Sequence, residues 1–257
     1  MAMHVAITGA SSGIGKELAL AYGKLASHLT LVARRVEILE ELARRISCPV
    51  SSFKVDLSEV DRAHLWVDRV QKEVGPIDIF INNAGVHFVG HPFGVSEEEV
   101  QFLFNVDFHT PLKLMHYLAR EMRQRGGGTI VNITSIAGLV ATPGMYYYNV
   151  AKSAFSVASE ALATELRGTG VHILTVYPGP VSTPMEAAIR RRYADFASSL
   201  LPTGRPEVLA RRVIGAVRRR KRRLFYPRIY RLTYTFRNVV QWVLDHFTPY
   251  PKEEEER

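Results

Sequence analysis

Three side chains near the middle of the chain have the types and the spacing that proton transfer to a bound molecule requires. Tyr148 and Lys152 stand four residues apart, and Ser135 lies thirteen residues before the tyrosine. Residues i and i+4 share one face of a helix, so Lys152 is expected beside the Tyr148 phenol. A free tyrosine has a pKa of about 10, so a phenol that works as acid or base at neutral pH needs a cation to stabilise its phenolate. The spacing therefore predicts that Lys152 lowers the pKa of Tyr148.

Two further tyrosines, Tyr146 and Tyr147, directly precede Tyr148 and compete for the same role. Only Tyr148 has a lysine four residues later, so it is the expected proton donor. Tyr146 and Tyr147 are expected to line a substrate pocket or to pack in the core. For Tyr148 itself, the alternative is a buried structural phenol.

A glycine-rich turn near the N-terminus predicts a phosphate-binding site. Residues 8–15 read Thr-Gly-Ala-Ser-Ser-Gly-Ile-Gly, after a strand-like apolar run and before a helical segment. Glycines let a pyrophosphate approach the backbone amides and the N-terminus of the following helix. The alternative is a plain strand-to-helix turn. The residues expected at the nucleotide are Gly9, Ser11, Ser12, Gly13, Ile14 and Gly15.

Two arginines at the end of the second strand-like segment select the nucleotide. In doubly wound folds an acid at this position bonds the ribose 2′-hydroxyl of NAD, whereas arginine accommodates the 2′-phosphate of NADP. Here the segment ends in Ala33, Arg34 and Arg35, without an acid. The predicted cofactor is therefore NADP(H), with Ser11 as a further contact to the phosphate. The alternative is that both arginines are solvated at a helix entrance.

The elements that must position these residues follow from hydrophobic periodicity. Strands are expected at residues 4–7, 29–33, 50–55, 77–81, 129–134 and 171–177. Helices are expected at residues 16–25, 36–46, 63–73, 96–123 and 148–167. This alternation is typical of βαβ units, so the sequence predicts an α/β fold with a parallel sheet.

Composition narrows the class of protein. A chain of 257 residues suits one large α/β domain and is short for two. Cys48 is the only cysteine, which leaves no internal disulfide and no cysteine zinc site, and favours a reducing, cytoplasmic compartment. The first residues already read as a strand, and no apolar run approaches the ~18 residues of a membrane span, so we expect neither secretion nor a transmembrane helix. The nine histidines are scattered, and no metal site is expected.

Charge is concentrated in the last fifth of the chain. Residues 205–257 contain 14 Lys and Arg against 6 Asp and Glu, so this segment carries the whole formal net charge of +8. The asymmetry favours an anionic partner for this end. The basic run at residues 218–223 has no recognisable nucleic-acid reading motif, so nucleic acid is not the expected partner.

An amphipathic pattern follows the basic run. Apolar residues recur every three or four positions from Ile229 to Phe247, with Arg228, Arg231 and Arg237 off that stripe. The pattern predicts a basic amphipathic helix. Three locations remain open for it: an anionic membrane surface, a subunit interface, or a cover over the substrate pocket.

Taken together, the motifs resemble those of a classical short-chain dehydrogenase/reductase over about residues 4–185. The resemblance is carried by several motifs in the family's order and near its spacings, namely the glycine turn at 8–15, Asp56-Leu57, Asn82-Asn83-Ala84-Gly85, Asn105, Ser135, Tyr148 with Lys152, and Pro178-Gly179. It implies a Rossmann-type doubly wound parallel sheet in a single domain, a nicotinamide cofactor, and a homodimer or homotetramer. The tail is similar to that of the hydroxysteroid-dehydrogenase-like branch.

The resemblance also implies roles for individual residues. Asn105, Ser135, Tyr148 and Lys152 would form a catalytic tetrad, in which Asn105 holds a water that connects Lys152 to solvent. Tyr148 would donate a proton to a carbonyl oxygen as hydride arrives at carbon, and Ser135 would hold that oxygen. The remaining cofactor contacts would be Asp56 and Leu57 at the adenine, Asn82, Ala84 and Gly85 in the cleft, and Pro178, Gly179, Val181 and Thr183 towards the nicotinamide.

The expected organisation is a catalytic domain at residues 1–204, with a lid at about 178–203, followed by a basic helix, a last strand and an amphipathic extension at 205–257. Apolar residues in the lid favour a lipophilic ketone, a steroid-like or an acyl substrate. The predicted function is an NADP(H)-dependent oxidoreductase that acts on a carbonyl or secondary alcohol. The alternative is a nucleotide-sensing regulatory protein that acts through a membrane-associating tail.

Overall fold

The computed structural model describes residues 3–193 and 202–251. Seven parallel strands form one sheet in the order β3-β2-β1-β4-β5-β6-β7. Their bounds are β1 His4–Thr8, β2 His28–Ala33, β3 Val50–Lys54, β4 Ile79–Asn82, β5 Gly128–Ile133, β6 Val171–Pro178 and β7 Arg223–Tyr226. The strand order reverses between β1 and β4, which opens a crevice at the carboxyl ends of the strands. The expected Rossmann-type doubly wound sheet is confirmed.

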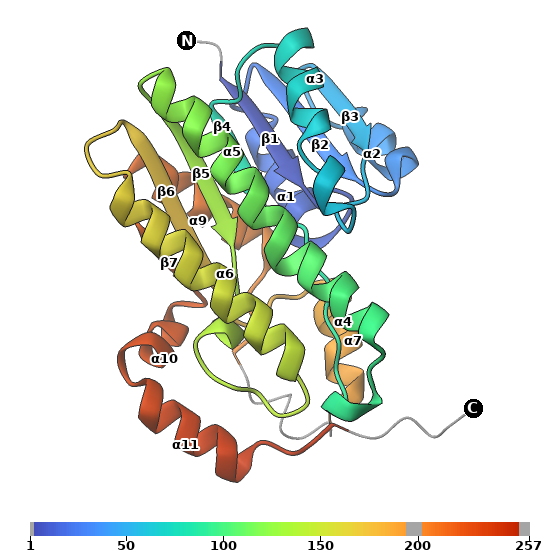
Figure 1. Cartoon of the computed structure of the whole chain (residues 1–257), viewed down its shortest axis with the longest axis vertical. Helices are drawn as coiled ribbons and strands as arrows, with labels where there is room; N and C mark the ends of the chain where they lie inside the picture. The colour runs from blue at the N-terminus through green and yellow to red at the C-terminus, as the bar shows by residue number, and fades with distance from the viewer. Residues whose placement is uncertain (1–2, 194–201, 252–257) are drawn as a thin grey trace.

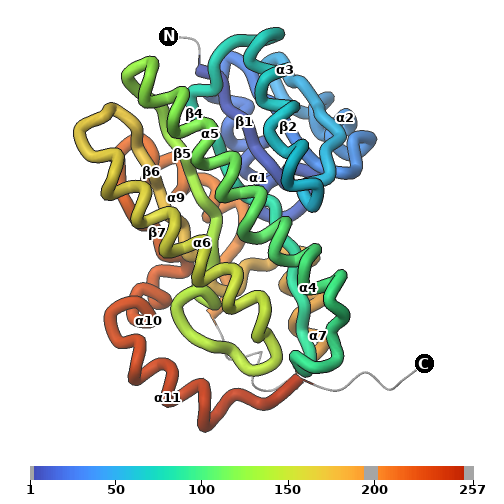
Figure 2. The backbone as a smooth tube through the Cα atoms, in the orientation of Figure 1, coloured from blue at the N-terminus to red at the C-terminus, as the bar shows by residue number. Residues whose placement is uncertain are grey.

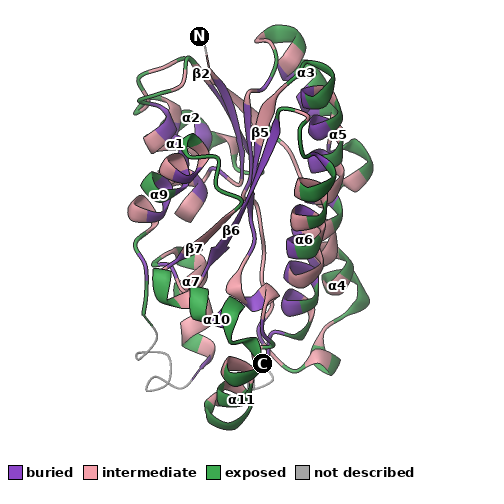
Figure 3. Ribbon diagram, turned by 90° about the vertical axis from the view of Figure 1, so that its left-hand side faces the viewer, coloured by how far each residue is buried: buried purple, intermediate pink, exposed green. Residues whose placement is uncertain are grey.

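Helices cover both faces of the sheet (Figures 1 and 3). One face carries α1 (Gly13–Tyr22), α2 (Val36–Ala43) and α9 (Pro206–Arg218). The other face carries α3 (Leu65–Glu73), α5 (Thr110–Gln124) and α6 (Tyr146–Glu165). The helices α4 (Glu97–Phe104), α7 (Pro184–Arg192), α10 (Arg231–Thr235) and α11 (Arg237–Phe247) gather beyond the carboxyl ends of the strands.

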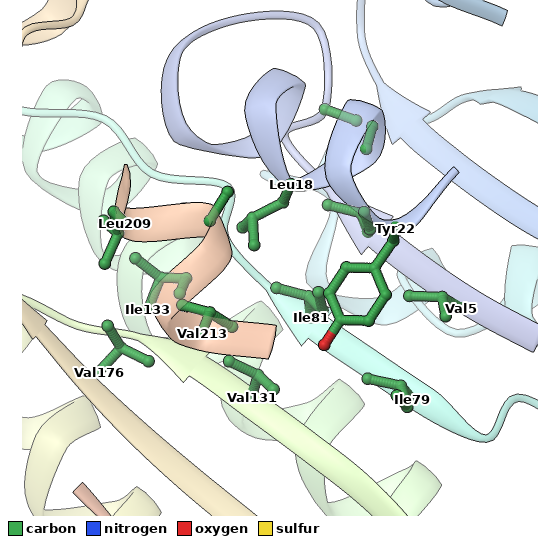
Figure 4. Close-up of a cluster of buried hydrophobic side chains, with 14 of the residues drawn as sticks. Val5, Leu18, Tyr22, Ile79, Ile81, Val131, Ile133, Val176, Leu209 and Val213 are labelled. Atoms are coloured by element: carbon green, nitrogen blue, oxygen red, sulfur yellow. The ribbon is translucent and has the colours of Figure 1, made fainter. Parts of the chain in front are cut away.

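The sheet is buried on both sides, which explains why its strands read as apolar runs rather than as alternating patterns. All five residues of β1 are buried. On one face, Leu18 and Tyr22 of α1 and Leu209 and Val213 of α9 pack over Ile81 and its neighbours (Figure 4). Burial of each such aliphatic side chain contributes about 1.5–3 kcal/mol. This packing holds the turn between β1 and α1 in a fixed place.

The long helix expected at residues 96–123 is divided. A capping box between Ser96 and Glu99 begins α4, and α4 ends at Phe104. A π-helical turn, Asn105–His109, then connects it to α5, with the N–H of Thr110 bonded to the carbonyl of Asn105. A π turn carries one more residue than an α turn and is frequent at functional sites. Apolar periodicity alone does not reveal it.

The C-terminal segment also differs from the single helix expected between Ile229 and Phe247. It consists of a 3-10 turn, Arg228–Tyr230, followed by α10 and α11. Phe236 interrupts the helix with φ −120° and ψ 44°. Figure 2 follows this segment around the lower end of the molecule, below α6. No helix among the described residues is long and apolar enough to cross a membrane.

Candidate active site

A cavity of about 1030 Å³ opens at the carboxyl ends of the strands, where the sheet order reverses. It extends from the turn between β1 and α1 to helix α11. The predicted site residues that line it are Gly9, Ser11, Ser12, Gly13, Ile14, Arg34, Arg35, Asp56, Leu57, Ala84, Gly85, Ser135, Tyr148, Lys152, Pro178, Gly179, Val181 and Thr183. Gly15, Asn82 and Asn105 do not line it.

Ser135, Tyr148 and Lys152 meet on one wall of the cavity. Tyr148 and Lys152 occupy the first two turns of α6, and both are buried, with 9% and 4% of their surfaces exposed. The Nζ atom of Lys152 lies 5.6 Å from the centroid of the Tyr148 ring. Ser135 follows β5, and its Oγ accepts the N–H of Ala137 at 3.1 Å, while the hydroxyl lies near enough to the Tyr148 phenol to lower its pKa. Tyr146, by contrast, is 57% exposed, which fits the choice of Tyr148 as the proton donor.

Burial raises the pKa of Tyr148 above its ordinary value. The Lys152 ammonium and the nearby Ser135 hydroxyl lower that pKa, as the spacing predicted for Lys152. Burial and the negative charges of Asp107 and Glu186 outweigh both effects. Lys152 therefore acts on the phenol in the predicted direction, although the pKa of Tyr148 remains above its ordinary value.

The polar partner of Lys152 is Asp107, a residue that the sequence analysis did not single out. Lys152 Nζ lies 3.5 Å from Asp107 Oδ2, and Asp107 Oδ1 accepts the N–H of Val86 at 2.8 Å. Asn105, the predicted fourth member of the tetrad, points elsewhere and donates to the carbonyl of Ser58 at 3.0 Å. Both residues belong to the π-helical turn, which places Asp107, two positions after Asn105, against Lys152. The expected role of Asn105, to hold a water that connects Lys152 to solvent, stays a prediction.

This pairing sets the charge of the lysine. Burial alone would lower the pKa of Lys152, but the adjacent Asp107 carboxylate more than offsets burial, and the pKa of Lys152 is raised. Lys152 is consequently an ammonium group inside a site that excludes most solvent. Its three N–H donors are available to Asp107 and to a bound molecule in the cavity.

Thr8 and Asn83 clamp the glycine turn to the end of β4. The Thr8 hydroxyl oxygen accepts the N–H groups of Asn83 at 3.0 Å and of Ala84 at 3.2 Å. In return, the Asn83 side-chain amide donates to the carbonyls of Thr8 at 3.0 Å and Gly9 at 3.2 Å. Gly9 has φ +65°, and a Cβ there would lie 2.7 Å from the Cα of Ala84. The turn therefore has its binding conformation without help from a ligand.

Two predicted cofactor residues lie behind the cavity wall. Asn82 is buried and donates from its amide to Oδ1 of Asn132 at 3.1 Å. Gly15 is buried in the first turn of α1, where a Cβ would collide with the Gly9 carbonyl and the Asn83 side chain. Gly15 therefore packs against the glycine turn, whereas Asn82 is bonded to β5, and their predicted contacts with a nucleotide stay predictions. Asn83, which stands beside Asn82 in the sequence, lines the cavity.

Positive charge gathers at the end of the cavity near β2. Arg35 donates to the Ser11 hydroxyl at 3.2 Å, and the Arg34 guanidinium lies 5.7 Å from the centroid of the Phe102 ring. Both arginines are exposed, so they are accessible to a bound anion. Asp56 faces the same region. Although burial raises its pKa, two hydrogen bonds from Ser58 and the charge of Arg34 prevail and hold the pKa of Asp56 below its ordinary value.

Helix α7 forms another side of the cavity, and its N-terminus lies beside the glycine turn, because a Cβ at Gly13 would lie 3.2 Å from Cγ2 of Thr183. Thr183 caps the helix by accepting the N–H of Glu186 at 3.2 Å, and Val181 pairs with Gly204 in an isolated bridge. Arg190 forms an ion pair with Glu186 at 2.8 Å, so this arginine has a partner within the chain. Of the apolar lid residues expected at about 178–203, those at 194–201 lie outside the described residues.

The C-terminal segment closes the far end of the cavity. Gln241 of α11 accepts the N–H of Ala141 at 2.7 Å and donates to the Ala141 carbonyl at 3.1 Å. Pro251 is buried against Gly144, and the ring of Tyr250 lies 6.1 Å from that of His91. The side chains of this segment that line the cavity are Tyr230, Thr233, Val240, Val243, Leu244 and Phe247. A cover over the pocket is one of the three locations that the sequence leaves open for this amphipathic segment.

The basic run at residues 218–223 is largely committed to contacts within the chain. Arg223 forms an ion pair with Glu160, Arg222 donates to the Thr164 hydroxyl at 2.9 Å, and Arg220 donates to the Gly170 carbonyl at 3.1 Å. These arginines attach the end of α9 and the start of β7 to the body of the protein. Among the described residues, no three His, Cys, Asp or Glu side chains lie close enough to hold a metal ion.

Comparison with known proteins agrees with this geometry. Residues 3–194 match the sequence family described as short chain dehydrogenase. A fatty acyl-CoA reductase of Mycobacterium tuberculosis is 36% identical over 191 residues, which cover 72% of this chain and 65% of that protein. 11-beta-hydroxysteroid dehydrogenase A of Sesamum indicum is 30% identical, with coverage of 93% of this chain and 73% of that protein. The structure of a short-chain dehydrogenase from Sphingobium yanoikuyae in complex with NADPH aligns with a TM-score of 0.80 and 25% identity, over 99% of this chain and 98% of that one.

The sheet order, the clamped glycine turn and the family match together define an oxidoreductase that uses a nicotinamide cofactor. Within that class, the chain belongs to the short-chain dehydrogenase family.

Proposed function

We propose that this protein is an NADP(H)-dependent oxidoreductase that transfers hydride between the nicotinamide and a carbonyl or secondary alcohol on a lipophilic substrate. The observation that carries the proposal is the convergence of Ser135, Tyr148 and Lys152 on the wall of the cavity that also contains the glycine turn. The cofactor supplies the hydride, and the protein supplies position and electric field. The preformed glycine turn, in which a side chain at position 9 would collide with Ala84, fits a bound pyrophosphate.

Each side chain has a distinct task in carbonyl reduction. Tyr148 donates its proton to the carbonyl oxygen, and the Ser135 hydroxyl stabilises that oxygen as negative charge develops. Lys152 holds the ribose of the nicotinamide nucleotide and moderates the cost of forming the Tyr148 phenolate. Asp107 forms an ion pair with Lys152, and Asn105 would hold the water that connects Lys152 to solvent. Oxidation of an alcohol uses the same groups in reverse.

The preference for NADP(H) rests on Arg34, Arg35 and Ser11. The three residues line the same end of the cavity, and Arg35 already contacts the Ser11 hydroxyl. A 2′-phosphate placed there would accept charge-assisted hydrogen bonds, each contributing about 1.5–3 kcal/mol. The relative from Sphingobium yanoikuyae, whose structure contains NADPH, gives independent support.

A lipophilic substrate follows from the walls of the cavity beyond the cofactor. These walls are formed by apolar side chains from four separate segments, namely Val140, Met145, Ile189, Val240, Val243 and Leu244. Such a lining desolvates and binds aliphatic or ring carbon. Two relatives carry names that fit this chemistry, a fatty acyl-CoA reductase and a hydroxysteroid dehydrogenase.

The test combines cofactor binding with turnover. NADPH and NADH are titrated against the wild type and an Arg34→Ala/Arg35→Ala variant, and oxidation of NADPH is followed with a panel of long-chain and ring ketones. We expect the double variant to lose about 10- to 100-fold in NADPH affinity while its NADH affinity changes little. Tyr148→Phe should keep NADPH binding and lose turnover by about 10²–10⁴-fold. Equal turnover in Tyr148→Phe would remove the proposal and favour the nucleotide-sensing alternative.

An anionic membrane surface is the proposed partner of the outer side of the C-terminal segment. Val239 and Trp242 are 62% and 55% exposed, and the arginines at 228, 231 and 237 are also exposed. Aromatic and aliphatic side chains with neighbouring cations are typical of interfacial helices. The protein would then be cytoplasmic and peripherally bound, with the C-terminal segment between the cavity and the lipid.

Vesicle sedimentation tests this partner. Wild-type protein should bind anionic vesicles at low salt, and Trp242→Glu should weaken binding about tenfold or more. Val157→Glu is the matched control, because Val157 is 69% exposed on α6, away from the C-terminal segment. If Trp242→Glu instead dissociates a homodimer or homotetramer in light scattering and vesicles are ignored, this surface is a subunit interface.

A further inference from the structure

Thr233 places a buried hydroxyl group in the wall of the cavity that neither the proposed chemistry nor the folded chain uses. The residue lies on α10, is 4% exposed and lines the cavity. Within the described part of the chain its hydroxyl makes no hydrogen bond. Two tyrosine hydroxyls of the same cavity are bonded to backbone carbonyls, that of Tyr193 to Pro143 at 2.6 Å. The hydroxyl of Tyr230 is bonded to the carbonyl of Pro202 at 3.1 Å.

Folding alone does not explain a threonine at this position. Burial of a hydroxyl without a partner destabilises a protein, whereas valine has nearly the same shape and no polar atom to satisfy. The other side chains that the C-terminal segment contributes to the cavity include the apolar Val240, Val243 and Leu244. A few polar groups in a mostly apolar pocket fix the orientation of a ligand and give specificity. The Thr233 hydroxyl, which can both donate and accept, is therefore available to a polar atom of a bound molecule.

Thr233 is held in place by its neighbours on both sides. The ring of Tyr230 packs against Gly179, where a Cβ would lie 2.5 Å from the ring. The ring of Tyr234 lies 5.4 Å from that of Phe225 in β7. Helix α10 is thus anchored beside the carboxyl ends of β6 and β7. A hydroxyl in such a fixed position can recognise one particular group of a ligand.

We propose that Thr233 is a specificity-determining residue whose hydroxyl binds a second oxygen atom of the substrate, in a hydroxyl or carbonyl group other than the one that reacts. The substrate class is then a lipophilic ketone with a further oxygen function, rather than a ketone whose remaining carbon skeleton is plain hydrocarbon. The apolar walls bind the skeleton, and Thr233 selects the orientation in which the reacting carbonyl meets Tyr148. The inference rests on the proposed function and narrows its substrate class.

Matched ketones test the second oxygen. NADPH oxidation is measured with three ring ketones of one skeleton, namely dihydrotestosterone, androstanedione and androstanone, which carry a further hydroxyl, a further carbonyl and no further oxygen. A series of straight-chain ketones, in which a hydroxyl group is moved along the chain, is compared with its parent ketone. We expect kcat/KM to be about five- to tenfold higher for at least one oxygenated ketone than for its parent. The preferred member shows whether the group is a hydroxyl or a carbonyl. A wild type that prefers no oxygenated ketone would overturn the inference.

Thr233→Val removes the hydroxyl and keeps the shape of the side chain. The preference should disappear through a higher KM for the oxygenated ketone, while kcat and the KM for the parent ketone change little. Thr233→Ser, which keeps a hydroxyl, should restore most of the preference. Thr235→Val is the matched control, because Thr235 is an exposed residue of the same helix and its hydroxyl donates to the carbonyl of Arg231 at 3.3 Å. An undiminished preference in Thr233→Val, or an equal loss in Thr235→Val, would contradict the assignment.

Calorimetric titration separates this inference from the proposed function. The preferred oxygenated ketone and its parent are titrated into the wild type and Thr233→Val in the presence of NADP⁺, with which a ketone cannot react. We expect the wild type to bind the oxygenated ketone about five- to tenfold more tightly than the parent, and Thr233→Val to bind both equally. Equal affinities in the wild type, or no binding of either ketone, would overturn the inference. Turnover of the parent ketones would uphold the proposed function whatever the titration shows, whereas selective binding without turnover of any ketone would contradict the proposed function and support the role of Thr233.

Discussion

The two ends of the cavity are built by different means. At the cofactor end, backbone atoms and short polar side chains fix the wall, since Thr8 and Asn83 clamp the glycine turn through four hydrogen bonds of 3.0–3.2 Å. At the substrate end, apolar side chains of α11 form the wall, and the two hydrogen bonds between Gln241 and Ala141 help to attach that helix. The first wall belongs to the core of the sheet, and the second is a segment laid over it.

The cofactor end and the substrate end of the cavity should therefore tolerate substitutions differently. A clamped backbone cannot shift to admit an added atom, so the cofactor end should fail steeply when it is altered. An apolar wall made by a single helix can lose a methyl group or a hydrogen bond and keep its shape, so the substrate end should change in selectivity rather than collapse. Three substitutions test the contrast.

The largest effect should come from Gly15→Ala. The added Cβ would meet the Gly9 carbonyl and the Asn83 amide, and both atoms belong to the clamp. We expect a loss of about 1–3 kcal/mol in the free energy of unfolding, together with a loss of tenfold or more in NADPH affinity. Chemical denaturation and fluorescence titration measure the two quantities.

Gly215→Ala is the control for this substitution. Gly215 lies in the interior of α9, and nothing stands within 4 Å of the position its Cβ would take. Alanine there should stabilise the protein by about 0.5–1 kcal/mol and leave the nucleotide affinity unaltered. If Gly15→Ala behaved like Gly215→Ala, the clamp would not be rigid and the contrast between the two ends would disappear.

An intermediate effect is expected from Leu244→Ala on the cavity side of α11. The lost contact area should raise the KM for a long-chain ketone by about tenfold, because full burial of a leucine contributes about 1.5–3 kcal/mol. The KM for a small ketone and the affinity for NADPH should change by less than about twofold. Val239→Ala, on the exposed side of the same helix, should leave all three values unaltered in the absence of vesicles. Identical effects on long and short substrates would mean that Leu244 does not contact the substrate.

The smallest effect should follow Gln241→Ala, which removes both hydrogen bonds to Ala141. Each such bond contributes about 1 kcal/mol net, and the apolar contacts of α11 remain. We expect the KM for the long-chain ketone to rise about two- to fivefold with kcat nearly constant. Gln101→Ala on α4, which removes a surface hydrogen bond to Asn105, is the comparison. An effect as large as that of Leu244→Ala would show that polar contacts, rather than apolar ones, hold the substrate end together.

Residues that act through local geometry were predictable from sequence. The alternation of apolar runs predicted the strands before residue 180, and the four-residue spacing of Tyr148 and Lys152 placed both side chains on one face of α6. The turn at Gly9 and Gly13 was predictable because few other residues adopt φ values of +65° and +54°.

Residues whose position depends on the rest of the fold were not predictable. Asp107 reaches Lys152 only because a π-helical turn interrupts an otherwise helical segment, and hydrophobic periodicity does not report an inserted residue. Asn82 and Asn83 belong to the same motif, but of the two only Asn83 lines the cavity. The apolar stripe of the tail was correctly read as amphipathic, but its break at Phe236 and its placement over the cavity depend on contacts with Ala141 and Gly144.

Because of the π-helical turn, the geometry of the site depends on the number of residues in this segment as well as on their types. Deletion of one residue within 105–109 would convert the π-helical turn into a regular α-helical turn, which is the commoner backbone geometry. Such a deletion would also rotate every later position by about 100°, since one residue spans that angle in an α-helix. Asp107 would then leave Lys152 although each of the two residues is still encoded. Deletion of one residue from this segment would therefore be more damaging than most single substitutions.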